Sequence, residues 1–146
     1  MNSNNIEIIL IEDNPNDAEL AIDALRSKNL ANKIKILKDG EEAMNFFFGN
    51  SKSDDSRMSN IPKLILLDLK LPKISGLEVL KKLKSSKFTK NIPVVVLTSS
   101  REHTDLITSY DYGVNSYIVK PVDFDQFMNA VSEVGLYWML LNEPLK

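Results

Sequence analysis

Short apolar runs recur along the chain, and each of them predicts a β-strand. The runs span Ile6–Ile11, Lys33–Lys38, Leu64–Leu67, Val94–Leu97 and Tyr117–Val119. The first, third and fourth are largely apolar, as strands buried on both faces of a sheet require. The second alternates lysine with isoleucine, so we expect it at an edge of the sheet.

Segments with helical spacing of apolar residues lie between and after these strands. The first predicted helix begins at Asn14-Pro15, the second contains Ala43–Phe47, and the third begins at Ser75-Gly76. The fourth extends from Ser99 to near Gly113, and the fifth extends from Asp123 to about Leu141. Asn14 suits an N-cap and Pro15 the first helical position, and Asn29 ends that first helix. In the fourth helix, Leu106, Ile107 and Tyr110 share one face.

Strands that alternate with helices predict an α/β protein with right-handed crossovers and helices on both faces of a parallel sheet. The pattern favours a flavodoxin-like (βα)5 three-layer sandwich with strand order 2-1-3-4-5, in which ligands bind at the carboxyl ends of the strands. We expect one domain over residues 1–146, with its core at about 6–141. The polar stretch at 49–62 lacks periodicity and predicts a surface insertion.

This topology brings together five polar residues that are far apart in the sequence. The residues at the carboxyl ends of the predicted strands are Glu12, Asp13, Asp68, Thr98 and Lys120. Three carboxylates in one shallow cleft repel one another unless a cation lies between them, and a hard divalent ion such as Mg²⁺ (or Mn²⁺) suits oxygen ligands. With the metal and Lys120 drawing charge from an incoming phosphoryl group, Asp68 is the candidate nucleophile.

Two neighbours complete this predicted chemistry. The backbone carbonyl of Lys70, in the loop after Asp68, is a further candidate metal ligand, and Thr98 offers a hydroxyl to a phosphoryl oxygen. The alternative, that Glu12 and Asp13 are a solvated strand end without a functional role, is less favoured. Asp17, by contrast, is expected to support the start of the first helix.

Composition narrows the function classes. Hydrophobic residues make up 43% and charged residues 26% of the chain, as in ordinary globular proteins. There are no cysteines and one histidine, His103, so disulfides and zinc sites are not expected. A net charge of -2 gives no electrostatic basis for nucleic-acid binding. The polar N-terminus and the lack of a bilayer-spanning apolar run favour a cytoplasmic protein with no membrane contact.

The ordered motifs resemble the receiver domain of two-component response regulators (CheY-like), over about Ile6 to Leu141. The resemblance rests on the acidic pair Glu12-Asp13, on Asp68 with Pro72 and Gly76 in DLKLPKISG, on Thr98, and on Lys120-Pro121. It implies that Asp68 accepts a phosphoryl group and that Glu12, Asp13, Asp68 and the Lys70 carbonyl hold the metal. It also implies that Thr98 and Lys120 sense the phosphoryl group.

The resemblance further implies a conformational switch. Tyr117 matches the family's switch aromatic, which turns inward as Thr98 moves, although a static packing role for this tyrosine stays open. Pro121 is the cis-proline candidate, because a cis bond is inexpensive before proline. The changed face comprises the fourth helix, the fifth strand and the fifth helix.

The long loop after Phe48 and the ending GLYWMLLNEPLK resemble small stand-alone regulators paired with phytochrome-type sensor histidine kinases. The expected partners are therefore a sensor histidine kinase and a downstream or phosphotransfer protein, and the chain is either an output adaptor or a relay intermediate. The apolar end of the last helix, with Tyr137, Trp138 and Met139, predicts a dimer or kinase interface. Alternatively, the tail after Asn142 folds back and covers it.

Two other classes of protein are less consistent with the sequence. An aspartyl-phosphate hydrolase typically has a second aspartate two positions after the nucleophile, where this chain has Lys70. A flavin-binding electron carrier needs a phosphate loop rich in hydroxyls and glycine, but EDNPND follows the first strand. Outside the site, Ser99 and Glu102 predict a capping box, and Lys81, Lys82, Lys84 and Lys87 predict a solvated helix face.

Overall fold

The structure is a computed structural model of the chain, and it describes residues 8–27, 33–49, 62–99, 101–120 and 125. The elements within these residues are β1 (Ile8–Ile11), α1 (Pro15–Ser27), β2 (Ile34–Leu37), α2 (Gly40–Phe48), β3 (Leu64–Leu67), α4 (Gly76–Ser85), β4 (Val94–Thr98), α5 (His103–Asp111) and β5 (Ser116–Val119). Within the described residues, each strand lies within one residue of its predicted apolar run.

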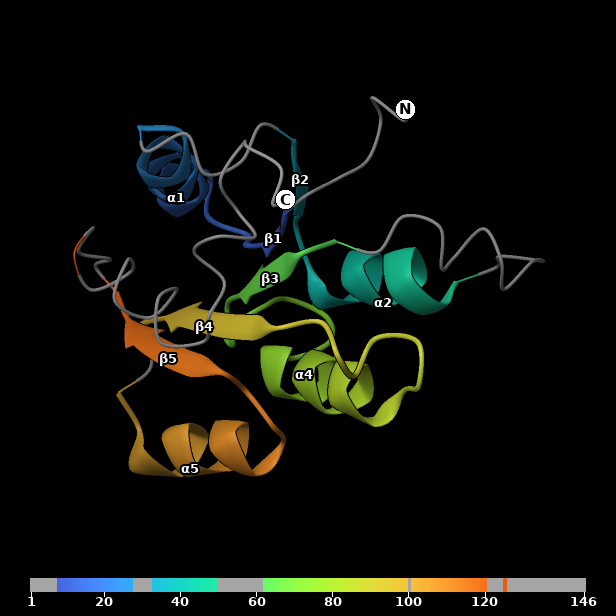
Figure 1. Cartoon of the computed structure of the whole chain (residues 1–146). Coiled ribbons are helices and arrows are strands. Elements are labelled where there is room, and N and C mark those ends of the chain that lie inside the picture. The colour runs from blue at the N-terminus through green and yellow to red at the C-terminus, as the bar shows by residue number, and fades with distance from the viewer. Residues whose placement is uncertain (1–7, 28–32, 50–61, 100, 121–124, 126–146) are drawn as a thin grey trace, which may run out of the picture.

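The five strands form one parallel sheet of order β2-β1-β3-β4-β5 (Figure 1). This arrangement confirms the predicted flavodoxin-like topology. Strands β1, β3 and β4 are buried at every residue, whereas β2 lies at the edge and exposes Lys35 and Ile36. The burial pattern therefore follows the sequence pattern, in which the inner strands are apolar and an edge strand carries lysines.

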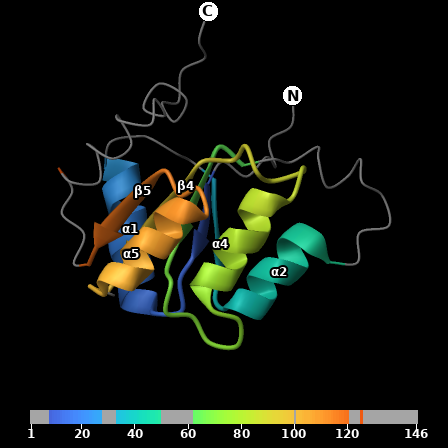
Figure 2. The same ribbon diagram turned by 90° about the horizontal axis from the view of Figure 1, so that it is seen from below.

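Helices cover both faces of the sheet and produce three layers. Helix α1 lies on one face, and α5, α4 and α2 lie side by side across the other (Figures 1 and 2). Alternate residues of each strand point to opposite faces, so Leu10 and Leu66 pack beneath α1 while Ile11 and Leu67 pack beneath α2 and α4. The two hydrophobic cores hold the strands rigidly, and the strand ends define the position of the site.

Local capping explains where two of the helices begin. Ser75 caps α4, because its Oγ accepts a hydrogen bond from the backbone N–H of Glu78. Asn14 precedes α1, and its Oδ1 accepts from the backbone N–H of Asp17 at 3.0 Å. The sequence predicted Asn14 as an N-cap, and it predicted that a helix begins at Ser75-Gly76.

The structure contradicts two local predictions. Helix α5 begins at His103 with Glu102 at the N-cap and no side-chain cap, so the Ser99–Glu102 capping box is wrong. The shared face of Ile107 and Tyr110 is about half exposed, and Ser109 is the buried residue of α5. Lys84 is half-buried, since its ammonium donates to the carbonyl of Ile92 at 2.7 Å, and burial lowers its pKa.

Several predictions fall outside the described residues. These are the end of the first helix at Asn29, positions 50–61 of the insertion, Pro121, the helix from Asp123 to Leu141, and the interface residues Tyr137, Trp138 and Met139. Within the described part of the chain, no helix has the length and apolar character needed to cross a bilayer.

Candidate functional site

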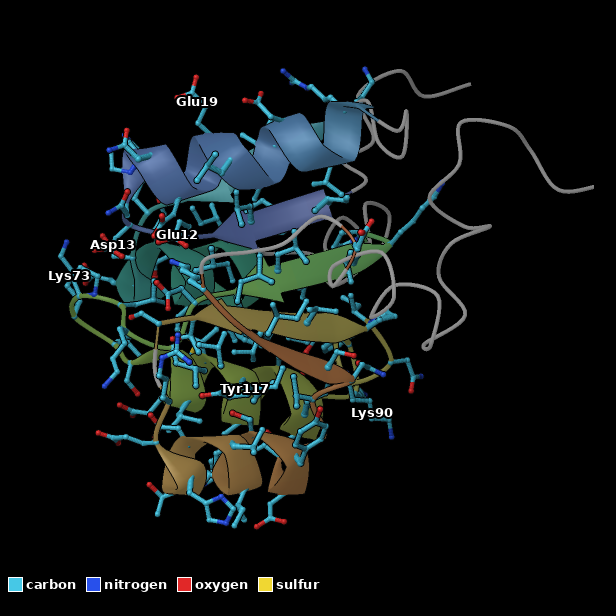
Figure 3. The ribbon with its side chains drawn as sticks, turned by 90° about the vertical axis from the view of Figure 1, so that its left-hand side faces the viewer. Glu12, Asp13, Glu19, Lys73, Lys90 and Tyr117 are labelled. Atoms are coloured by element: carbon cyan, nitrogen blue, oxygen red, sulfur yellow. The ribbon has the colours of Figure 1, made fainter. Side chains whose placement is uncertain are left out.

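The candidate site lies where the strands end. Glu12 directly follows β1, Asp68 directly follows β3, Thr98 is the last residue of β4, and Lys120 directly follows β5. Figure 3 shows Glu12 and Asp13 at this end of the sheet and Lys90 at the opposite end. The parallel topology therefore brings the predicted residues to one edge, as the sequence indicated.

Three carboxylates form the acidic part of the site. Oxygen atoms of Glu12, Asp13 and Asp68 all lie within 4.8 Å of one another. Glu12 and Asp68 are buried, whereas Asp13 is exposed and leaves one side open to solvent. Carboxylate oxygens around a site with solvent access suit a hard divalent ion that keeps part of its water shell. The donor set therefore fits Mg²⁺ or Mn²⁺.

Lys120 supplies the positive charge of the site. Its Nζ lies 2.6 Å from Glu12 Oε1, 2.8 Å from Asp17 Oδ2 and 3.2 Å from Asp68 Oδ2. Burial by itself lowers the pKa of Lys120, but its hydrogen bonds to Asp17 and Glu12 and the charge of Asp68 outweigh burial and raise the pKa. The ammonium group is therefore held firmly in its charged form.

One ammonium does not balance the carboxylates around it. Burial raises the pKa of Glu12 from its usual 4.5 to about 7, the hydrogen bond from Lys120 opposes this rise, and repulsion from Asp68 adds to it. Both oxygens of Glu12 are engaged, because Oε2 also accepts from the backbone N–H of Asn14 at 3.2 Å. The site is short of positive charge, so a bound cation would relieve the repulsion between its carboxylates.

The backbone holds Asp68 in place on both sides. Its N–H donates to the carbonyl of Ile11 at 3.0 Å, and its Oδ1 accepts from the N–H of Lys70 at 3.1 Å. Gly76 begins α4 directly against this segment, and a Cβ there would overlap the Asp68 carbonyl oxygen. Close packing therefore explains why the last position of the DLKLPKISG motif is a glycine.

The loop between Asp68 and α4 is tied to the neighbouring connection. The N–H of Gly40 donates to the carbonyl of Pro72 at 3.2 Å. Lys73, which has a positive φ of 71°, lies at the same end of the sheet as Glu12 and places its Nζ 3.3 Å from Glu41 Oε1 (Figure 3). These contacts fix the path of the chain beside the acidic cluster.

The two predicted switch residues lie on strands β4 and β5. Thr98 is fully buried, and its carbonyl accepts from the N–H of Lys120 at 2.8 Å, which joins the two strand ends. Tyr117 is partly buried and packs against the core on the face covered by α4 and α5 (Figure 3). Thr98 therefore lies directly at the site, whereas Tyr117 lies on the neighbouring strand β5, beside the site.

The sequence interpretation missed one member of the site, Asp17. It was expected only to support the start of α1, but its carboxylate binds the Lys120 ammonium. The available signal was its position in the first helical turn, four residues after Asp13. An acidic residue there is common in any helix, so the position alone could not distinguish the two roles.

Comparisons with known proteins agree with this geometry. The family model of the response regulator receiver domain matches residues 8–132. Response regulator Rcp1 from Synechocystis sp. is 37% identical over 132 residues, which cover 90% of this chain and 88% of that protein. The probable methanogenesis regulatory protein FilR2 from Methanothrix harundinacea is also 37% identical over 132 residues, which cover 90% of this chain and 83% of that protein.

Solved structures show the same similarity. The bacteriophytochrome response regulator AtBRR has a TM-score of 0.77 and 47% identity, with 95% of this chain and 99% of that chain covered. The Mn²⁺-bound form of Rcp1 has a TM-score of 0.73 and 37% identity, with coverage of 96% and 99%. The phosphorylated cyanobacterial phytochrome response regulator RcpA has a TM-score of 0.74 and 37% identity, with coverage of 92% and 94%.

The family model spans most of the chain, the sheet order is that of the flavodoxin-like fold, and the acidic cluster and its lysine occupy the carboxyl edge of the sheet. The chain therefore belongs to the response regulator receiver domain family, the phosphoacceptor modules of two-component signalling.

Proposed function

We propose that Asp68 is the residue of this receiver that accepts the phosphoryl group. The observation that carries the proposal is the environment of its carboxylate, which is buried at the end of a central strand with Lys120 Nζ 3.2 Å away and two further acids beside it. A nucleophilic carboxylate needs such a positive neighbour to receive a group that is itself negatively charged.

Glu12, Asp13, Asp68 and the backbone carbonyl of Lys70 are the proposed ligands of Mg²⁺ or Mn²⁺. Support comes from the three clustered carboxylates and from the relative Rcp1, whose solved structure is a Mn²⁺-bound form. When bound, the cation would offset the negative charge of the phosphoryl oxygens.

The proposed reaction is a transfer from a phosphohistidine. An oxygen of the Asp68 carboxylate attacks phosphorus, an O–P bond forms, and the N–P bond to the donor imidazole breaks. The imidazole nitrogen keeps the bonding electron pair and takes up a proton from solvent, and Asp68 becomes an acyl phosphate. Lys120 and the Thr98 hydroxyl donate hydrogen bonds to the phosphoryl oxygens, so the protein contributes mainly position and charge.

The proposed output is a change in protein contacts. Thr98 moves toward the phosphoryl group, and Tyr117 follows it inward, which alters the surface of α5 and β5. The partial burial of Tyr117 and the exposed Ile107 and Tyr110 on α5 support this surface as the one that changes. The Lys120-Pro121 bond is the candidate cis peptide that orients Lys120.

The proposed donor is a phytochrome-type sensor histidine kinase in the cytoplasm. Support comes from the similarity to AtBRR and RcpA, both phytochrome response regulators. The coverage of 95% of this chain and 99% of AtBRR also supports a stand-alone regulator with one domain over residues 1–146. The surface insertion at 49–62 stays a prediction from the sequence. Downstream, we propose contact with an effector or phosphotransfer protein, and a homodimer through Tyr137, Trp138 and Met139.

The test is phosphorylation with acetyl phosphate and Mg²⁺, followed by intact-mass measurement. The wild type is expected to gain one phosphoryl group, the Asp68→Asn variant none, and chelation of the metal should prevent the gain. Asp111→Asn is the matched control, because Asp111 is an exposed aspartate at the last residue of α5, outside the acidic cluster. A sensor histidine kinase phosphorylated on its histidine serves as the second donor.

Equal labelling of the wild type and the Asp68→Asn variant would move the acceptor to another residue. Failure of the wild type with both donors would overturn the proposal and leave a receiver that signals without phosphorylation.

A further inference from the structure

The hydrogen bonds of Lys120 are unevenly shared among its three carboxylate partners. Its Nζ lies closer to Glu12 and Asp17, at 2.6 and 2.8 Å, than to Asp68, at 3.2 Å. An ammonium group has three N–H donors, and three carboxylates occupy them here. No donor is left for a phosphoryl oxygen unless one of these contacts is released.

Asp17 is the partner whose release costs least. Its side chain is 36% exposed, compared with 3% for Glu12 and 6% for Asp68, so water can replace Lys120 at its carboxylate. A buried carboxylate that lost its cation would have no such replacement. Asp68 receives the incoming phosphoryl group and Glu12 is a proposed metal ligand. Asp17 is therefore the partner that we expect Lys120 to release.

We infer that Asp17 is a positioning residue that holds Lys120 in the unphosphorylated protein and competes with the phosphoryl group for its ammonium. The inference rests on the proposed role of Asp68 as phosphoacceptor. In the phosphorylated protein, Lys120 leaves Asp17 and donates to a phosphoryl oxygen, and water solvates the Asp17 carboxylate. Asp17 therefore sets how strongly the resting state resists phosphorylation.

Removing this competitor should favour the phosphorylated state. A partly exposed ion pair contributes little, so Asp17→Asn is expected to raise the affinity for a phosphoryl mimic by about fivefold. Asp17→Ser, which also lacks the carboxylate and suits the first helical turn, should have the same effect. Glu19→Gln should leave the affinity unchanged. This substitution removes the same charge from the same helix, but the Glu19 side chain points away from the sheet (Figure 3).

The experiment is an equilibrium titration with beryllofluoride, a tetrahedral mimic of a phosphoryl group on a carboxylate, in excess Mg²⁺. Wild type, Asp17→Asn, Asp17→Ser and Glu19→Gln are compared, after circular dichroism has confirmed that each is folded. A gain in affinity of both Asp17 variants, with Glu19→Gln at the wild-type value, is the expected result. Unchanged or weaker binding by the Asp17 variants would overturn the inference.

A second measurement follows the contact itself without reference to activity. In metal-free protein, the ammonium signal of Lys120 in a nitrogen–proton spectrum should shift in Asp17→Asn and stay in place in Glu19→Gln. In the wild type, the carboxyl carbon signal of Asp17 should shift when beryllofluoride binds. An Asp17 signal that does not respond would mean that Lys120 keeps this partner, and the competition would be refuted.

An error in the phosphoacceptor and an error in the role of Asp17 give different binding results. If the wild type does not bind beryllofluoride, or Asp68→Asn binds it equally well, the proposed phosphoacceptor is wrong. If the wild type binds and Asp68→Asn does not, while the Asp17 variants match the wild type, only the role of Asp17 is wrong.

Discussion

Replacing Glu12 with glutamine is expected to stabilise the metal-free protein above neutral pH. Glu12 is buried, and its pKa rises from the usual 4.5 to about 7 because burial and repulsion from Asp68 outweigh its hydrogen bond with Lys120. One unit of pKa corresponds to about 1.4 kcal/mol, so ionised Glu12 costs the folded state about 3 kcal/mol relative to the unfolded chain.

The direction of the pH dependence follows from the raised pKa. A group that holds its proton more tightly when folded contributes stability that is complete below its unfolded pKa of 4.5 and is lost as the pH rises through about 7. Glutamine keeps an acceptor for Lys120 and does not ionise. Glu12→Gln should therefore exceed the wild type in free energy of unfolding by about 1–3 kcal/mol at about pH 8.5, and by little at about pH 5.

Urea denaturation in the presence of a metal chelator, followed by circular dichroism, measures the difference. Glu19→Gln, an exposed charge change on α1, is the control and should alter stability little at either pH. Added Mg²⁺ should narrow the gap at the higher pH, because it binds the folded wild-type site more strongly than the variant. A Glu12→Gln variant that is less stable than the wild type at both pH values would refute the shortage of positive charge.

Three further changes test the framework of the site by chemical denaturation. Lys120→Met should destabilise the metal-free protein by about 3 kcal/mol or more, because it leaves buried carboxylates without their cation; a loss below about 1 kcal/mol would contradict this. Gly76→Ala should cost more than Gly113→Ala, since a Cβ at Gly76 overlaps the Asp68 carbonyl whereas Gly113 has room and only its φ of 102° is unfavourable; the reverse order would reject the steric role. Leu80→Ala should cost about 2–5 kcal/mol in the fully buried core, and a near-neutral change would contradict the packing.

The strands, and the position of the site at their carboxyl ends, were predictable because their sequence signals are local and strong. Leu64–Leu67 is apolar at every residue and forms β3 with the predicted bounds, and the lysines of β2 marked it as an edge strand. Once the order of parallel strands is known, the residues after each strand must meet at one edge. Glu12, Asp68 and Lys120 therefore came together from sequence pattern and topology alone.

The errors concern choices that tertiary contacts decide. Asp17 reads as an ordinary acidic residue in a first helical turn, and only the fold places it within reach of Lys120. On α5, apolar spacing placed Ile107 and Tyr110 on one face, but the sheet receives the face that carries Ser109. A short helix with a mixed pattern has more than one face that could pack, so its rotation depends on its neighbours.

Lys84 illustrates the same limit for a charged residue. Its place among other lysines predicted a solvated face, yet its long aliphatic stem lies partly buried and its ammonium reaches the carbonyls of Lys90 and Ile92. Those carbonyls belong to the connection before β4, six and eight residues further along the chain. Helical periodicity carries no information about such a contact.

The most direct test of the central claim is to identify the phosphorylated atom by chemistry. The protein is phosphorylated with acetyl phosphate and Mg²⁺, treated with borohydride, which reduces an acyl phosphate to an alcohol, and mapped by peptide mass spectrometry. Conversion of Asp68 to homoserine, dependent on both phosphodonor and metal, is the result that we predict. Conversion of Glu12, Asp13 or another acid with Asp68 intact would contradict the account.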